Sequence, residues 1–106
     1  MATGRLGTAN LTAGTNTVLY TCPTGNFAVA TVSICNRSNS AITCRVSLSS
    51  TSTPSADEWI EYDTEILPKG VLERTGIVMQ AGLNLIVYSS AATVSAVAMG
   101  IETPTS

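Results

Sequence analysis

Apolar and polar residues alternate along much of this chain, most clearly in residues 27–36 and 41–50. Side chains of a β-strand point alternately to its two faces, so each segment is predicted to be a strand with one buried and one exposed face. The positions expected to face the core are Ala28, Ala30, Val32 and Ile34 in the first segment, and Ile42, Cys44, Val46 and Leu48 in the second.

Similar β-rich runs recur roughly every 8–12 residues, with Gly, Asn, Pro or Ser between them, which is typical of an all-β sandwich or barrel. No segment carries the 3.6-residue apolar period of an amphipathic helix over a useful length. We therefore expect an all-β, antiparallel fold of about eight short strands. The strands are predicted at residues 4–11, 15–22, 26–36, 41–49, 59–63, 71–79, 83–89 and 93–102.

The connections between these runs are polar. Residues 36–41 are predicted to form a hairpin loop, because Asn and Ser favour tight turns. The longest connection, residues 49–58, ends in Ser55-Ala56-Asp57-Glu58, which has the pattern of a capping box and predicts one helical turn. The length of 106 residues predicts a single domain, residues 1–106, with an extended N-terminal arm at 1–13 and a loose C-terminal tail at 103–106.

The chain carries unusually little charge. Charged residues make up 11% of it, against about 25% in a typical soluble protein, and Ser and Thr take their place. Such a surface suits a protein that sits against neighbours. The net charge is -2 and the five basic residues are scattered, so we do not expect nucleic-acid binding. There is no apolar run near the roughly 18 residues that a membrane span needs, and no secretory signal is expected at the N-terminus.

The chain contains no histidine. This removes the Ser–His–Asp triad, the Cys–His dyad and the usual general base at neutral pH. No phosphate-binding glycine loop and no CxxC zinc pattern occurs either. We therefore expect a protein that is not an enzyme and that binds no metal or cofactor.

The three cysteines, Cys22, Cys35 and Cys44, are an odd number. A secreted disulfide framework usually pairs all its cysteines, so we expect free thiols packed as small apolar groups. A disulfide between Cys35 and Cys44, on adjacent strands, is the alternative.

Most of the acid lies between residues 57 and 65, around the only tryptophan, Trp59. On a regular strand Glu61, Asp63 and Trp59 share one face, with the two carboxylates about 7 Å apart. Such a pair could hydrolyse a glycosidic bond or help to bind Ca²⁺. A small sandwich leaves little room for a deep cleft, however, and no calcium-binding loop is present. A solvated strand edge, or an acidic rim that meets a basic partner, fits the segment better.

We expect this segment to form an edge strand and loop that contact neighbouring subunits. Aromatic rings bury a large area at low entropic cost, so the tyrosines at 20, 62 and 88 suit either an interface or the edge of the core. Arg45, on an outward strand face, and Arg37, in the predicted hairpin, can pair with the acids within the chain or across a subunit boundary. The candidate interface residues are therefore Arg37, Arg45, Trp59, Glu61, Tyr62 and Asp63.

Several segments resemble small virion structural proteins of tailed bacteriophages, and together they span nearly the whole chain. They are VLYTCP (18–23), VSICNR (32–37), WIEYD (59–63), LPKGVLERTGI (67–77) and GIE (100–102). The resemblance implies a β-sandwich or jelly-roll-like subunit, made in the host bacterial cytoplasm and attached to the outer surface of the capsid. The role it implies is that of a capsid decoration, or cement, protein, which binds the major capsid protein and is commonly a homotrimer.

Two alternatives remain open. Tail- or fibre-associated virion modules use similar folds, so the resemblance does not fix the position on the particle. A carbohydrate-binding adhesion module, with Trp59 and the tyrosines as stacking faces, is the alternative from a different functional class.

Overall fold

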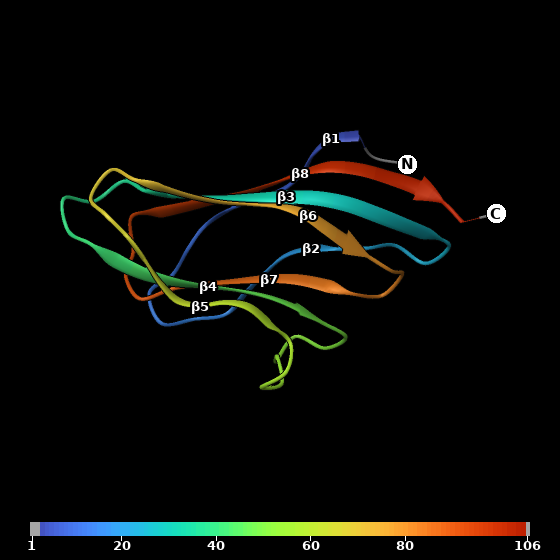
Figure 1. Cartoon of the computed structure of the whole chain (residues 1–106), viewed down its shortest axis with the longest axis horizontal. Coiled ribbons are helices and arrows are strands. Elements are labelled where there is room, and N and C mark those ends of the chain that lie inside the picture. The colour runs from blue at the N-terminus through green and yellow to red at the C-terminus, as the bar shows by residue number, and fades with distance from the viewer. Residues whose placement is uncertain (1–2, 106) are drawn as a thin grey trace.

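The computed structural model describes residues 3–105, and the regular elements in this range are eight β-strands (Figure 1). Every predicted strand is present, with ends that lie within three residues of the predicted bounds. The strands are β1 (Thr3–Asn10), β2 (Thr17–Thr21), β3 (Asn26–Asn36), β4 (Ile42–Ser49), β5 (Trp59–Ile66), β6 (Val71–Met79), β7 (Asn84–Ser89) and β8 (Val94–Pro104).

The strands form two four-stranded antiparallel sheets that lie one above the other as a sandwich (Figure 1). Sheet A has the order β1-β8-β3-β6 and sheet B the order β2-β7-β4-β5. Along the chain, β4 pairs with β5, β3 with β6, β2 with β7 and β1 with β8. These four pairs are those of one long hairpin, which is folded over so that its strands are divided between two sheets. This is the jelly-roll arrangement. The expected jelly-roll-like sandwich is confirmed.

The core lies between the two sheets and follows the predicted alternation. On β3 all four predicted core positions are buried; on β4 Ile42, Cys44 and Val46 are buried and Leu48 is half-buried against the core. Burying one large aliphatic side chain stabilises a fold by about 1.5–3 kcal/mol relative to leaving it exposed. These inward faces therefore hold the sandwich together.

The connection between β3 and β4 is not a hairpin, so that prediction was wrong. β3 belongs to sheet A and β4 to sheet B, and residues 37–41 arch from one sheet to the other. Asn36, at the start of this arch, is fully buried. Its Nδ2 donates to the carbonyl oxygens of Ser40 at 2.8 Å and of Ile66 and Leu67 at 3.2 Å. Asn36 thereby ties the arch to the turn after β5.

A buried hydrogen bond also links the two sheets near the other end. The Tyr20 hydroxyl, on β2, donates to Glu102 Oε2, on β8, at 2.6 Å. Both residues are buried. Burial, followed by the contact with Glu102, raises the pKa of Tyr20, so the phenol stays protonated as a donor. The pair fixes β2 against β8.

The capping-box residues make their hydrogen bonds without a helix. Ser55 N donates to Glu58 Oε1 at 2.7 Å, and Glu58 N donates to the Ser55 carbonyl at 3.0 Å. These residues form a single turn, and the predicted helical turn is absent. The side-chain bond was predicted correctly, whereas the helix was not.

Residues 3–11 and 103–105, within the predicted arm and tail, contact the rest of the sandwich. Residues 3–10 form β1, which pairs with β8 of the same sheet, and Leu11 is buried. At the other end β8 runs to Pro104, and Thr105 N donates to the Gly25 carbonyl at 3.0 Å. Residues 1, 2 and 106 of the predicted arm and tail lie outside the described residues.

All three cysteines are free thiols, as predicted. Cys44 faces the core from sheet B, whereas Cys35 lies on the outer face of sheet A. The alternative Cys35–Cys44 disulfide is wrong, because β3, which carries Cys35, and β4, which carries Cys44, lie in different sheets and Cys35 points away from the sheet that carries Cys44.

Replacing Asn36 with Ala should destabilise the fold by about 2–4 kcal/mol, because the buried Ile66 carbonyl and two part-buried carbonyls lose their donor. Asn36→Asp should cost more, because it sets a carboxylate against those carbonyl oxygens. Urea unfolding measures the free energy. Asn39→Ala, an exposed change in the same arch, is the control and should cost less than about 0.5 kcal/mol. An equally small cost for Asn36→Ala would contradict the role given to this side chain.

The thiols should differ in reactivity. Burial raises the pKa of Cys22, and burial together with the charges of Glu61 and Asp63 raises the pKa of Cys44 to about 11. Both therefore carry little thiolate at pH 8, since the thiolate is the reactive form. With a disulfide reagent at pH 8 we expect rapid labelling of Cys35 alone, and labelling of the other two after unfolding. Cys35→Ser should remove the rapid phase, and a rapid phase that persists contradicts the assignment.

Candidate functional site

Arg45 and three aromatic rings gather on the outer face of sheet B. The guanidinium carbon of Arg45 lies 4.2 Å from the ring centroid of Tyr62, 4.4 Å from that of Tyr88 and 5.8 Å from that of Trp59. Trp59 and Tyr62 meet edge to face, with centroids 5.3 Å apart and planes at 73°. All these distances lie within the range of cation–π and aromatic attraction. We call these four residues the Arg45 cluster.

Irregular pairing of β5 brings the cluster together. Arg45 and Tyr88 are direct cross-strand neighbours on β4 and β7. On a regular strand Trp59 and Tyr62 point to opposite faces. The β4–β5 register shifts on both sides of Val46, and Asp63 adopts a positive φ of 52°. These bulges break the alternation, so both rings reach Arg45.

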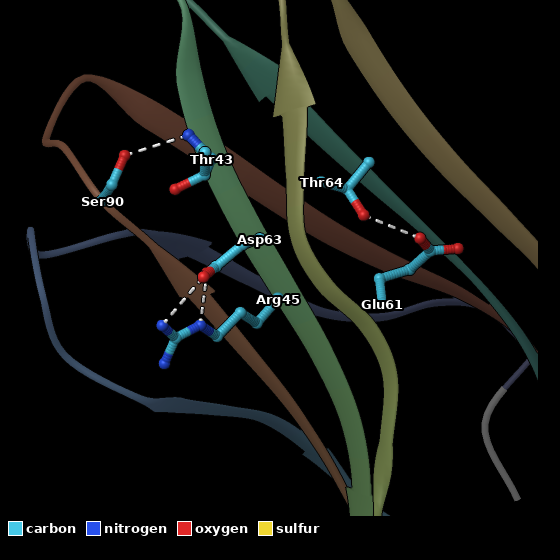
Figure 2. A network of polar contacts seen from close by, with 6 residues as sticks. All are labelled: Thr43, Arg45, Glu61, Asp63, Thr64 and Ser90. Carbon is cyan, nitrogen blue, oxygen red and sulfur yellow. Dashed lines mark hydrogen bonds and ion pairs between the residues drawn. The ribbon is translucent and has the colours of Figure 1, made fainter.

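Asp63 holds the guanidinium in place. Arg45 Nε donates to Asp63 Oδ1 at 2.6 Å, and Nη2 donates to Oδ2 at 3.4 Å (Figure 2). The hydrogen bond to Asp63 raises the pKa of Arg45. The ion pair compensates the charge at the centre of the cluster. The cluster therefore presents aromatic rings around a guanidinium group whose position is fixed and whose charge is neutralised. It is not a site for a free anion.

Glu61 points away from this group, so the prediction that Glu61 and Asp63 share a face was wrong. Figure 2 shows the two carboxylates on opposite sides of β5. Glu61 Oε2 accepts from Arg74 Nη1 at 2.9 Å, and Oε1 accepts from Thr64 Oγ1 at 2.9 Å. The bond to Arg74, on β6, joins the edges of the two sheets. The bulges separate the acids, so they do not form the carboxylate pair of a glycoside hydrolase.

Arg37 lies apart from the other candidates. It is in the arch after β3, whereas Trp59 follows the loop at the other end of β4. Its Nη2 donates to Asn10 Oδ1 at 2.7 Å, and Lys69 Nζ donates to its carbonyl oxygen at 2.8 Å. The structure thus brings together Arg45, Trp59, Tyr62 and Asp63 of the six predicted residues, and directs Glu61 and Arg37 elsewhere.

The loop between β4 and β5 covers part of the outer face of sheet B. Asn84 Nδ2 donates to the Thr51 carbonyl oxygen at 3.1 Å, which holds the loop against β7. Ile86 and Ser47 are fully buried, although Ile86 is not part of the core cluster between the sheets. Sequence alternation assigned this face to solvent. The burial of these residues depends on the path of the long polar loop, and the sequence of that loop has no periodic pattern from which its path could be predicted.

A shallow hollow opens where this loop meets β5. It has a volume of about 310 Å³ and is lined by Ala56, Trp59 and Tyr62. Tyr62 is 57% exposed, so one wall of the hollow is an accessible ring. An uncharged lining with an exposed aromatic face can receive an apolar side chain of a protein partner or one ring of a sugar.

Among residues 3–105 there is no group of three or more His, Cys, Asp or Glu side chains that could hold a metal ion. The same part of the chain contains no helix long and apolar enough to cross a membrane. The two acids of β5 that were predicted as site residues, Glu61 and Asp63, are each engaged by an arginine.

The loop beside the hollow should respond to acid through Glu58. The hydrogen bond from Ser55 N lowers the pKa of Glu58 below its ordinary value. A carboxyl group with a lowered folded pKa stabilises the folded loop fully above its unfolded pKa and loses that contribution as the pH falls through the folded value. Trp59 follows the loop directly, so its fluorescence should change with a midpoint below the ordinary glutamate pKa.

Glu58→Gln should abolish this transition, because the amide oxygen still accepts the bond but does not titrate. Asp57→Asn, an exposed change next to it, is the matched control and should leave the transition in place. A transition that survives in Glu58→Gln assigns it to another group.

The fold and the cluster were compared with known proteins in three ways. No protein-family model, no curated protein and no solved structure matches this chain. What the site can do therefore follows from its own geometry: an aromatic surface around an arginine paired with an aspartate, with a hollow at its edge.

Proposed function

We propose that this chain is a non-enzymatic structural protein of a tailed-bacteriophage virion, which binds the outer surface of the assembled capsid as a decoration protein. The observation that carries the proposal is the Arg45 cluster. Trp, Tyr and Arg are the residues most enriched in the energetic centres of protein interfaces. Here they gather on an outer face beside the edge strand β5, with the arginine already paired and oriented by Asp63.

The pairing of Arg45 favours docking over chemistry. A preformed ion pair costs less ordering on binding than a free, mobile arginine, because fewer rotamers remain to be fixed. The exposed ring of Tyr62 and the hollow beside it give a partner both a ridge and a recess. No group in the cluster is left as a general base.

The proposed partners are the major capsid protein and other copies of this chain, as a homotrimer. One contact of ordinary size buries about 800 Å² on each partner. Several such contacts engaged together gain from effective concentration, so moderate individual affinities produce a lasting attachment. A decoration protein of this kind needs a rigid scaffold and matching surfaces, which the sandwich supplies.

The hollow favours one second candidate, a carbohydrate-binding adhesion module. Trp59 and Tyr62 offer aromatic faces at a recess of about 310 Å³, the lower end of the size of ligand pockets. This function uses the same residues but a different ligand, so one set of variants tests both candidates.

The test is co-sedimentation of the purified protein with assembled capsids that lack it. Tyr62→Ala removes an exposed ring and should weaken capsid binding about 30-fold, as expected for an interface centre of about 2 kcal/mol. Leu67→Ala is the matched control, because Leu67 is 63% exposed in the turn after β5, away from the cluster. It should leave binding unchanged.

Electron microscopy of the decorated particle and a glycan array separate the alternatives. Density on the capsid surface supports the proposal, and density on the tail alone assigns the chain to the tail- or fibre-associated class. Wild-type protein that binds neither capsid nor tail overturns the virion role. Glycan binding that Tyr62→Ala abolishes would then support the adhesion module.

A further inference from the structure

The outer face of sheet A is a second exposed surface, on the opposite side of the sandwich from the Arg45 cluster. Val78, Val29 and Ile101 are direct cross-strand neighbours on β6, β3 and β8. Their side chains are 65%, 43% and 52% exposed, and Phe27, two residues before Val29, is 37% exposed. An apolar row across three adjacent strands is more than the single exposed apolar residues found on any surface.

Charge on this face is confined to its two edges. The register places Arg5 beside Met99 and, one strand further, Thr31, so Arg5 faces outward from the edge strand β1. Glu73 is paired with Ser33 and faces outward from the opposite edge strand β6. The other outward positions that the register assigns on β1, β3, β6 and β8 are uncharged. The face therefore has an uncharged middle, crossed by the apolar row, with one positive and one negative border.

We propose that this face binds the same face of a second copy of the chain, related by a two-fold axis that runs along the strands in the plane of contact. Such an axis reverses the strand order β1-β8-β3-β6, so β8 lies opposite β3 of the partner and β1 lies opposite β6. Ile101 then packs on the partner's Val29, and Val29 on the partner's Ile101, as a self-complementary contact requires.

The same axis pairs the two borders. Arg5 on one copy lies opposite the β6 edge of the other, which carries the partner's Glu73. The two residues are offset by two positions along β3, about 7 Å, a displacement that the length of an arginine side chain covers. Each dimer contains this ion pair twice. A foreign partner of uniform charge would match only one of the two borders, so the opposite charges favour a second copy.

The area is sufficient for a specific contact of moderate strength. Four strands about 4.8 Å apart, over roughly seven residues, cover about 19 by 23 Å, or near 440 Å² of flat area per copy. Side chains add to this flat area, so the accessible surface buried on the two copies together approaches about 1,200 Å², the lower end of specific interfaces. Two sheets stacked about 10 Å apart with strands within about 30° of alignment is also the usual packing of β-sheets face to face.

This contact goes beyond the proposed function and does not depend on it. The Arg45 cluster lies on sheet B and remains free when two copies meet through sheet A. Capsid binding and the two-fold contact can therefore fail separately.

Analytical ultracentrifugation over a concentration series tests the contact. In solution, where no capsid surface holds the proposed homotrimer together, the wild-type mass should rise to that of a dimer. Val29→Lys, at a position already partly exposed, should preserve the circular dichroism spectrum and weaken dimerisation about 30-fold or more, because it buries a charge at the centre of the face. Leu67→Lys adds the same charge off this face and should leave the dimer intact.

A charge exchange tests the two-fold geometry at low salt, where surface ion pairs are least screened. Arg5→Glu and Glu73→Arg should each weaken association several-fold, because each places like charges together twice. A mixture of the two variants should recover it, since the heterodimer contains two opposite-charge pairs, and the double variant should recover it alone.

A wild-type protein that is still monomeric at a concentration of about 1 mM overturns the inference, because its dimer would then be too weak to be specific. An oligomer of any size whose mass Val29→Lys does not change also overturns it. Recovery by neither the mixture nor the double variant overturns the two-fold arrangement. None of these results bears on capsid co-sedimentation, which reports on the opposite face.

Discussion

The structure depends on the burial of inward strand faces between two stacked sheets, most completely on the inner strands β3, β4, β7 and β8. Buried and less buried positions alternate without interruption along β3 and along the first half of β8, where Ala30, Val32, Ala96 and Ala98 are all buried. These strands are neighbours in sheet A, and their small side chains leave little bulk between this sheet and sheet B. The inward side chains of the central strands fill the space between the sheets, so we look for recognition on the outer faces, edges and loops.

Breaks in the alternation place the residues that these outer faces present. A β-bulge puts an extra residue into one strand and re-aims the side chains that follow it. The bulged pairing of β5 with β4 sends Asp63 to Arg45 and Glu61 to Arg74, so one acid orients the aromatic cluster while the other joins the sheet edges. The regular part of the fold provides rigidity, and its irregular strand provides the site.

Buried polar groups complement this apolar packing. Apolar burial is not directional, whereas a buried donor or acceptor requires a partner at a defined place. Asn36 joins the arch after β3 to the turn after β5, and the Tyr20–Glu102 hydrogen bond joins β2 to β8. Both connect segments far apart in the sequence. These hydrogen bonds favour the observed arrangement of the strands over other arrangements that would bury the same apolar faces.

The sequence by itself determined the class of fold, the eight strands and the inward faces of β3 and β4, because a period of two is a local property that neighbouring residues report. It also identified Trp59, Tyr62, Asp63 and Arg45 as candidates from their chemistry. Only the tertiary structure decided that 37–41 crosses between sheets, that Glu61 turns away from Asp63, and that Tyr88 completes the cluster. Register, bulges and strand order arise from pairing between distant segments, and alternation within one segment carries no information about them.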